Sequence, residues 1–176
     1  EVERWRATNG LGTGPAIALA PGSVGPGKRW TYYPEAAGLL VERGFNVWVV
    51  GGPGEKTLAA EIVAAAGGGV RDLTGTDLRN GILAMAAASV AISNDSGLMH
   101  VAAALGTPTM GIFGPTSPYH WAPLPELAET VKTRTNVPCQ PCHRPVCRMN
   151  HHRCMRDIPA SDVVEIAERV LRETIA

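Results

Sequence analysis

Short apolar segments and helical segments alternate along most of this chain. Two apolar runs, Ala16–Ala20 and residues 46–50, end at Pro-Gly and at Gly-Gly-Pro-Gly, which is typical of strands buried on both faces. Between them, residues 33–43 carry apolar side chains at helical spacing, and Gly44 follows where a helix C-cap is expected. A strand, a helix and a second strand in this order predict a βαβ unit, whose two strands are parallel.

The alternation continues beyond this first unit. Further strands are expected over residues 70–73, 89–92 and 109–113, and further helices over residues 56–66, 78–87, 96–105 and 161–175. The pattern predicts an α/β fold, in which a Rossmann-like, mostly parallel sheet carries helices on both faces and the crossovers are right-handed. After Gly114 the pattern loosens into a stretch rich in Pro and Cys that continues to Cys154, and Ser161 and Asp162 then cap the final helix.

Length and charge narrow the possible functions. The 176 residues, 45% of them hydrophobic, suffice for one core and fall short of the length typical of two domains. Lys plus Arg and Asp plus Glu each number 16, so no positive surplus exists to hold a nucleic-acid backbone, and nucleic acid is not expected as a partner. The sequence contains neither an apolar run of the roughly 18 residues that span a bilayer nor an export signal. A cytoplasmic protein is expected.

The first 15 residues differ from the rest. They are polar, lack an initiator Met and run directly into the first predicted strand. We therefore expect residues 1–15 to be a linker from a missing N-terminal domain, and residues 16–176 to form the folded unit.

A glycine-rich loop follows the first predicted strand. Residues 21–29 read PGSVGPGKR, so backbone amides can approach an anion and Lys28 can meet it as a point charge. The loop has neither the Walker spacing nor the GxGxxG fingerprint, which disfavours a P-loop kinase or an NAD enzyme. The alternative is an ordinary solvated turn.

A second loop of similar character, residues 93–97 (SNDSG), opens the helix expected from residue 96. The N–H groups of a helix's first turn favour an anion, and His100 lies one turn further along. The alternative makes Asp95 or Ser96 a simple N-cap. Because the carboxyl ends of parallel strands meet at one edge, the two loops are expected to flank one crevice that binds a diphosphate-bearing ligand such as a nucleotide sugar.

Longer motifs resemble a known family. Residues 94–118 (NDSGLMHVAAALGTPTMGIFGPTSP) and residues 20–30 (APGSVGPGKRW) are similar to the donor-binding core of the family 9 glycosyltransferases, the lipopolysaccharide heptosyltransferases. Residues 139–163 resemble the tail of the ADP-heptose:lipopolysaccharide heptosyltransferase II group. The resemblance implies a GT-B enzyme with two Rossmann-like domains, of which this chain is the C-terminal, donor-binding domain. The lipopolysaccharide core acceptor would be bound by the N-terminal domain, at the inner face of the cytoplasmic membrane.

The resemblance also implies a mechanism. Heptose passes from ADP-heptose to an acceptor hydroxyl in one inverting step, assisted by a general base that lies in the N-terminal domain, so this chain would bind the donor without turning it over. Lys28 would stabilise the leaving diphosphate, Ser23 would donate a hydrogen bond to it, and Ser96 and Gly97 would offer backbone amides.

Three further residues receive donor-binding roles from the same resemblance. Asp95 would accept hydrogen bonds from sugar hydroxyls, and His100 would line the donor pocket near the diphosphate. Glu55 would accept from the ribose, although a first-turn helix acid explains it equally well. No tightly bound cofactor is expected, and nothing indicates a divalent ion.

Four cysteines crowd into one short stretch. Cys139, Cys142, Cys147 and Cys154 are interleaved with His143, His151 and His152. Only the first pair has the spacing of a zinc knuckle, so reduced thiols packed under a long loop are favoured over structural zinc, and disulfides come third.

The sequence leaves alternatives to a lipopolysaccharide heptosyltransferase open. They are a family 9 enzyme with a different sugar or acceptor, a non-catalytic nucleotide-sugar-binding module, and a structural zinc-loop domain whose glycine loops are only turns. The tryptophans Trp30, Trp48 and Trp121 are expected to be packing residues.

Overall fold

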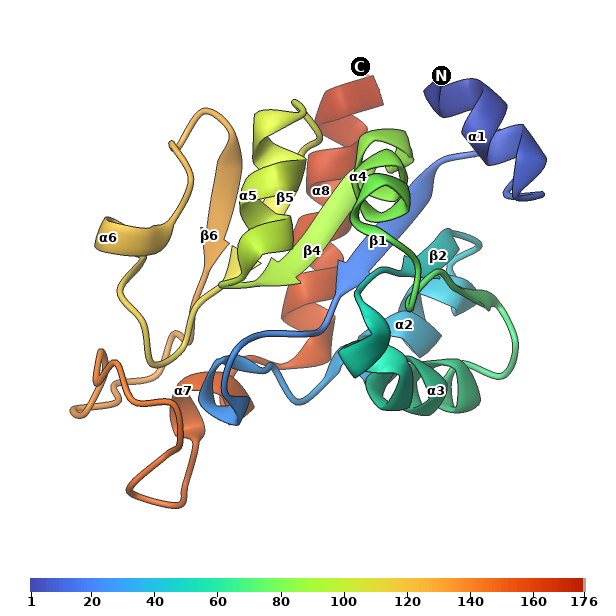
Figure 1. Ribbon diagram of the computed structural model, residues 1–176. Coiled ribbons are helices and arrows are strands. Elements are labelled where there is room, and N and C mark those ends of the chain that lie inside the picture. Colours follow the sequence, from blue (N-terminus) through green and yellow to red (C-terminus); the bar gives the residue numbers. More distant parts are fainter. Residues whose placement is uncertain (176) are drawn as a thin grey trace.

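A six-stranded, all-parallel sheet forms the centre of the computed structural model, which describes residues 1–175 (Figure 1). The strand order is β3-β2-β1-β4-β5-β6. The strands are β1 (Ala16–Ala20), β2 (Asn46–Val49), β3 (Val70–Asp72), β4 (Val90–Asn94), β5 (Thr109–Ile112) and β6 (Ala128–Val131). The predicted α/β fold with a Rossmann-like parallel sheet is confirmed.

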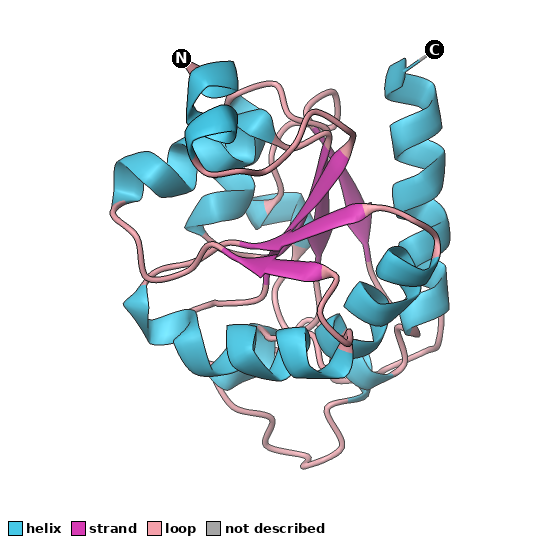
Figure 2. Cartoon of the chain, turned by 90° about the vertical axis from the view of Figure 1, so that its right-hand side faces the viewer, coloured by secondary structure: helices cyan, strands magenta, loops and turns pink. Residues whose placement is uncertain are grey.

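Helices cover both faces of this sheet (Figure 2). The α-helices are α1 (Val2–Thr8), α2 (Tyr33–Glu42), α3 (Lys56–Ala65), α4 (Leu78–Ala87), α5 (Gly97–Ala104), α6 (Pro118–Trp121), α7 (Arg153–Arg156) and α8 (Ala160–Ile175). Two 3₁₀ turns, η1 (Pro26–Lys28) and η2 (Pro53–Glu55), follow β1 and β2. None of the helices that the structure describes is long and apolar enough to cross a membrane.

Alternation of side chains along the strands separates two apolar layers. Ile17 and Leu19 of β1 pack in the layer that contains α2, α3 and α8. Ala16, Ala18 and Ala20 point to the other face, where α4 and α5 lie and where Trp48 is the largest buried side chain. Because both faces are covered, the four inner strands β1, β2, β4 and β5 are buried along nearly their whole length, and this is why their positions were predictable.

The strand order reverses beside β1. The chain builds β1, β2 and β3 toward one edge and then returns to place β4 on the other side of β1. At such a reversal the loops that leave the two neighbouring strands turn to opposite faces, which opens a crevice at the carboxyl ends. The loops in question are the two anion-suited loops identified from the sequence.

The stretch after Gly114 contains more regular structure than the sequence indicated. Edge strand β6 and the single-turn helices α6 and α7 lie in it. These elements are four residues long, too short for a periodic pattern. Trp30 and Trp48 are buried as expected, but the expectation for Trp121 was wrong, since 53% of its surface is exposed.

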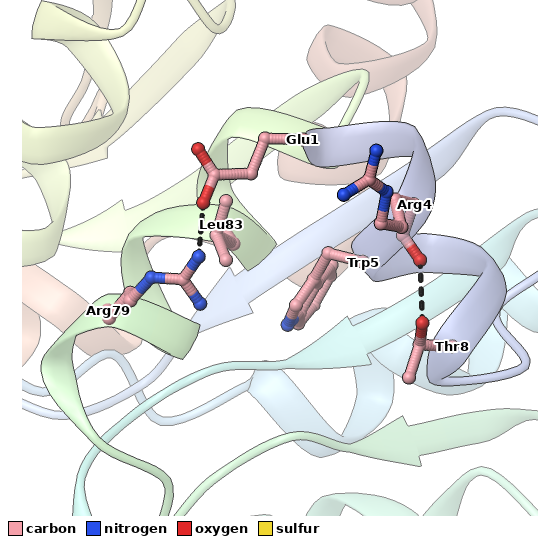
Figure 3. Close-up of a pocket in the computed structure, with 6 residues that line it drawn as sticks. All are labelled: Glu1, Arg4, Trp5, Thr8, Arg79 and Leu83. Atoms are coloured by element: carbon pink, nitrogen blue, oxygen red, sulfur yellow. Dashed lines mark hydrogen bonds and ion pairs between the residues drawn. The ribbon is translucent and has the colours of Figure 1, made fainter.

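Residues 1–15, expected to be a linker, contain helix α1, which packs on α4. Trp5 Nε1 donates to Asn80 Oδ1 (2.8 Å), and Glu1 pairs with Arg79 above a hollow of about 480 Å³ (Figure 3). Arg6 is buried: its Nη2 donates to the Gly14 carbonyl (2.7 Å) and its guanidinium lies 5.2 Å from the centre of the Trp48 ring. The helix is therefore attached to the core by Arg6 and to α4 by Glu1 and Trp5.

Replacing that arginine should destabilise the fold. Arg6→Ala removes a buried hydrogen bond and a cation–π contact, and we expect the free energy of unfolding to fall by about 1–3 kcal/mol. Arg4→Ala in the same helix changes an exposed side chain and should stay within about 0.5 kcal/mol of the parent. Urea denaturation followed by circular dichroism measures both, and equal effects would show that α1 is not anchored in this way.

Candidate functional site

An ion pair spans the crevice between the β1 and β4 loops. Lys28, in η1, places its Nζ 3.7 Å from Oδ2 of Asp95, the residue directly after β4. The Asp95 side chain is 9% exposed and also accepts a hydrogen bond of 2.8 Å from Thr116 Oγ1, beyond β5. The lysine side chain is 25% exposed, so it can still reach a ligand. The structure therefore brings together the two charged residues predicted from separate loops.

Asn94, the last residue of β4, is a structural residue that sequence reasoning missed. Its Oδ1 accepts from Trp30 N (3.1 Å) and from the Tyr33 hydroxyl (3.1 Å), and its Nδ2 donates to the Pro21 carbonyl (2.7 Å). It is completely buried. One side chain thus ties the glycine-rich loop at both ends to β4. The signal in the sequence was an amide that closes an apolar strand.

A pocket of about 260 Å³ opens beside the ion pair. Lys28 and Asp95 line one part of it, Thr116 and Trp121 another, and Arg144 a third. The pocket is therefore built by the loop after β1, the loop after β4, the segment after β5 and the Cys-rich stretch. Its charged lining suits a polar, anionic ligand.

The other predicted residues of the two loops, Ser23, Ser96 and Gly97, do not line this pocket. The Ser23 hydroxyl donates to the Gly25 carbonyl (3.2 Å), so in this conformation it is turned into its own loop. Ser96 is the N-cap of α5, with its hydroxyl 3.1 Å from that of Ser93, and Gly97 is exposed as the first residue of the helix. The first N–H groups of a helix have no partner within that helix. The amides at the start of α5 can therefore face an anion.

Glu55 and His100 do not line this pocket. The Glu55 carboxylate accepts from the Gly52 amide (2.7 Å) and lies against Gly22, where an added Cβ would be 2.6 Å from it. It therefore closes the turn after β2 and borders the β1 loop at the same sheet edge. His100 is exposed on α5, outside the pocket lining.

The Cys-rich stretch is fastened to the glycine-rich loop and to the segment after β5. The Gly27 amide donates to the Pro145 carbonyl (2.8 Å), and His152 Nε2 lies 2.7 Å from the Gly27 carbonyl. The amides of Cys142 and His143 both donate to the Pro115 carbonyl, at 3.0 and 2.8 Å. The stretch is thus part of the wall around the candidate site.

The four cysteines are free thiols that surround a small cavity of about 20 Å³ together with His151 and His152. Within residues 1–175, no group of three or more His, Cys, Asp or Glu side chains is arranged to hold a metal ion. Burial raises the pKa of the Cys154 thiol to about 11, and the other three cysteines add to this effect. The pKa of Cys147 is lowered instead. Partial burial acts to raise it, but hydrogen bonds from backbone N–H groups, chiefly that of His152, together have the larger effect and hold it below its ordinary value.

Comparison with known proteins agrees with this arrangement. Residues 2–153 match the family model described as glycosyltransferase family 9 (heptosyltransferase). The chain belongs to glycosyltransferase family 9. Lipopolysaccharide heptosyltransferase 2 of Salmonella typhimurium is 33% identical over 167 residues, which are 90% of this chain and 47% of that protein.

Solved structures of family 9 proteins extend the match. The structure of E. coli ADP-heptose LPS heptosyltransferase II is 30% identical, has a TM-score of 0.83 and is matched over 99% of this chain and 52% of its own. E. coli heptosyltransferase WaaC, solved with ADP, shares the fold at 20% identity and a TM-score of 0.73, over 96% of this chain and 48% of its own. This family 9 chain therefore spans about half the length of its relatives.

Asn94 gives a direct test of how the site is held. Asn94→Ala leaves the Pro21 carbonyl, the Trp30 amide and the Tyr33 hydroxyl without this partner, and we expect the free energy of unfolding to fall by about 2–4 kcal/mol. Asn46→Ala, which removes an exposed hydrogen bond to Pro15, is the control and should cost less than about 1 kcal/mol. Chemical denaturation of both variants makes the comparison, and a loss at Asn94 no larger than at Asn46 would contradict the assignment.

Proposed function

We propose that this chain is the C-terminal, donor-binding half of a GT-B lipopolysaccharide heptosyltransferase, which transfers heptose from ADP-heptose to the inner core with inversion. The observation that carries the proposal is the Lys28–Asp95 pair at the point where the strand order reverses. This is the position at which open α/β sheets bind ligands. The pair is built by the two motifs through which the chain resembles family 9.

Two further observations support ADP-heptose as the donor. The relative in Salmonella typhimurium is named as a lipopolysaccharide heptosyltransferase, and WaaC was solved with ADP. In this chain, Lys28 and Asp95 line the pocket, and α5 begins two residues after Asp95, so its N-terminal amides follow directly on the pocket lining, as expected for a ligand with a diphosphate.

In the proposed reaction, negative charge grows on the diphosphate as the glycosidic bond breaks. Lys28 offsets this charge, and the amides of Ser96 and Gly97 donate to it from the helix N-terminus. Ser23 needs to rotate its hydroxyl away from the Gly25 carbonyl to join them. Asp95, fixed by Thr116, accepts from sugar hydroxyls next to the anomeric carbon.

His100 and Glu55 lie outside the lining of the pocket that holds Lys28 and Asp95. Glu55 meets the ribose across the β1 and β2 loops, where its carboxylate borders Gly22. His100 is exposed on α5 and does not line the pocket, so no contact with the diphosphate is assigned to it.

The acceptor side of the reaction lies with the other half of the enzyme. The general base and the lipopolysaccharide core site belong to the N-terminal domain in this proposal, so this chain binds donor without transferring heptose. The complete enzyme would work at the cytoplasmic face of the inner membrane, where an ADP-sugar is available.

Binding measurements test the proposal. Lys28→Ala removes a charge partner of the diphosphate, and we expect ADP affinity to fall by about 10-fold or more. Glu55→Ala should weaken ADP less, because a ribose hydroxyl is a neutral donor. Isothermal titration calorimetry with ADP, and with UDP as the control nucleotide, gives the values, and thermal unfolding checks that each variant is folded. Absence of ADP binding to the parent chain, or an equal or larger loss at Glu55, would contradict the proposal.

A further inference from the structure

The pocket beside Lys28 has a charge balance that the two family motifs do not explain. Lys28 and Asp95 are 3.7 Å apart, so their charges largely cancel at the pocket floor. A diphosphate carries more than one negative charge, and Asp95 repels it at this distance. Lys28 alone therefore leaves the site with little net positive charge, and a second cation would add to what the N-terminal amides of α5 provide.

The Cys-rich stretch supplies that cation. Arg144 lines the pocket together with its neighbours His143 and Pro145, on the wall formed by this stretch. Within residues 1–175, the Arg144 guanidinium makes no hydrogen bond or ion pair, in contrast to Arg153, whose Nε donates to Asp157 at 3.0 Å. Arg144 is thus an uncommitted, permanently charged side chain at the pocket.

The backbone that carries Arg144 is fixed with respect to Lys28. Pro145 accepts from the Gly27 amide, one residue before the lysine, and His143 donates to Pro115. Gly27 approaches so closely that an added Cβ would be 2.9 Å from the Pro145 carbonyl oxygen and 3.0 Å from that of Arg144. Only glycine permits this contact. The backbone segments that carry the two cations are therefore in direct contact, and both side chains line the same pocket.

We propose that Arg144 is a second diphosphate-binding residue of the donor site, lining the same pocket as Lys28, and that the Cys-rich stretch serves to present it. The planar guanidinium can donate two hydrogen bonds to one phosphate group, which a single ammonium cannot do in the same geometry. The identity of the ligand rests on the proposed function, because it is the nucleotide donor that brings the diphosphate.

Calorimetry on single variants of the whole chain tests this inference. Arg144→Ala should weaken ADP binding by about 10-fold and should also weaken the binding of inorganic pyrophosphate. The affinity for adenosine, which lacks phosphate, should stay unchanged. Arg144→Lys should restore part of the loss because it keeps the charge. Arg148→Ala is the matched control: Arg148 is an exposed arginine of the same stretch outside the pocket lining, and ADP affinity should stay within about 2-fold of the parent.

The outcomes separate this inference from the proposed function. If Lys28→Ala weakens ADP binding and Arg144→Ala does not, the role of Arg144 as a second cation is refuted, while the donor site at Lys28 stands. If Arg144→Ala weakens adenosine binding as much as ADP binding, the contact of Arg144 with the diphosphate is also refuted. The same holds if Arg148→Ala weakens ADP binding as much as Arg144→Ala does. If the parent chain binds neither ADP nor pyrophosphate, both proposals fail.

Discussion

β1 and β4 pair side by side in the middle of the sheet, and their loops separate at the carboxyl ends. The site depends on this one pairing. Pro21 and Asp95 lie 74 positions apart along the chain, and only the pairing of β1 with β4 brings them to the same crevice. Asn94 adds a second connection by binding the Pro21 carbonyl, the Trp30 amide and the Tyr33 hydroxyl. The glycine-rich loop, mobile in principle, is thereby fixed at both ends in front of the anion-suited helix.

The Cys-rich stretch completes the site from the far end of the chain. Its backbone reaches Gly27 in one loop and Pro115 in another, so it joins the segments that follow β1 and β5. Only Cys154 is buried as expected for a packed thiol, and burial raises its pKa, whereas Cys142 and Cys147 are half-buried and Cys139 is exposed. Figure 1 shows this stretch and α7 below the carboxyl ends of the strands, away from α1. A part of the protein with little regular structure thus forms one wall of the pocket.

Sequence reasoning predicted the strands and helices that are held by hydrophobic burial. β1 and α4 have the expected bounds, and most other ends differ by one or two residues, because an apolar run closed by Gly or Pro has few other placements. The loops of Lys28 and Asp95 were placed together for the same reason, since parallel strands align their carboxyl ends. Helix α1 escaped prediction because it is held by individual contacts, such as those of Arg6 with Gly14 and Trp48 and of Trp5 with Asn80, which leave no periodic pattern in the sequence.

The wall after Gly114 escaped prediction for a similar reason. Its conformation depends on single hydrogen bonds to the carbonyls of Gly114 and Pro115, given by Gln140, Cys142 and His143, and such pairings leave no periodic trace in a sequence. Arg144 lies in this wall, so its place in the same pocket as Lys28 became visible only with the fold.

The central claim is that a nucleoside diphosphate binds where the β1 and β4 loops separate. Titration of ADP into ¹⁵N-labelled protein, followed by heteronuclear NMR, tests it most directly because every amide reports its own environment. We expect the largest shift changes at the amides of residues 23–25, 27–28, 96–97 and 143–144, since Pro26 and Pro145 carry no N–H group. Changes centred on the hollow between α1 and α4, or no change at saturating ADP, would contradict it.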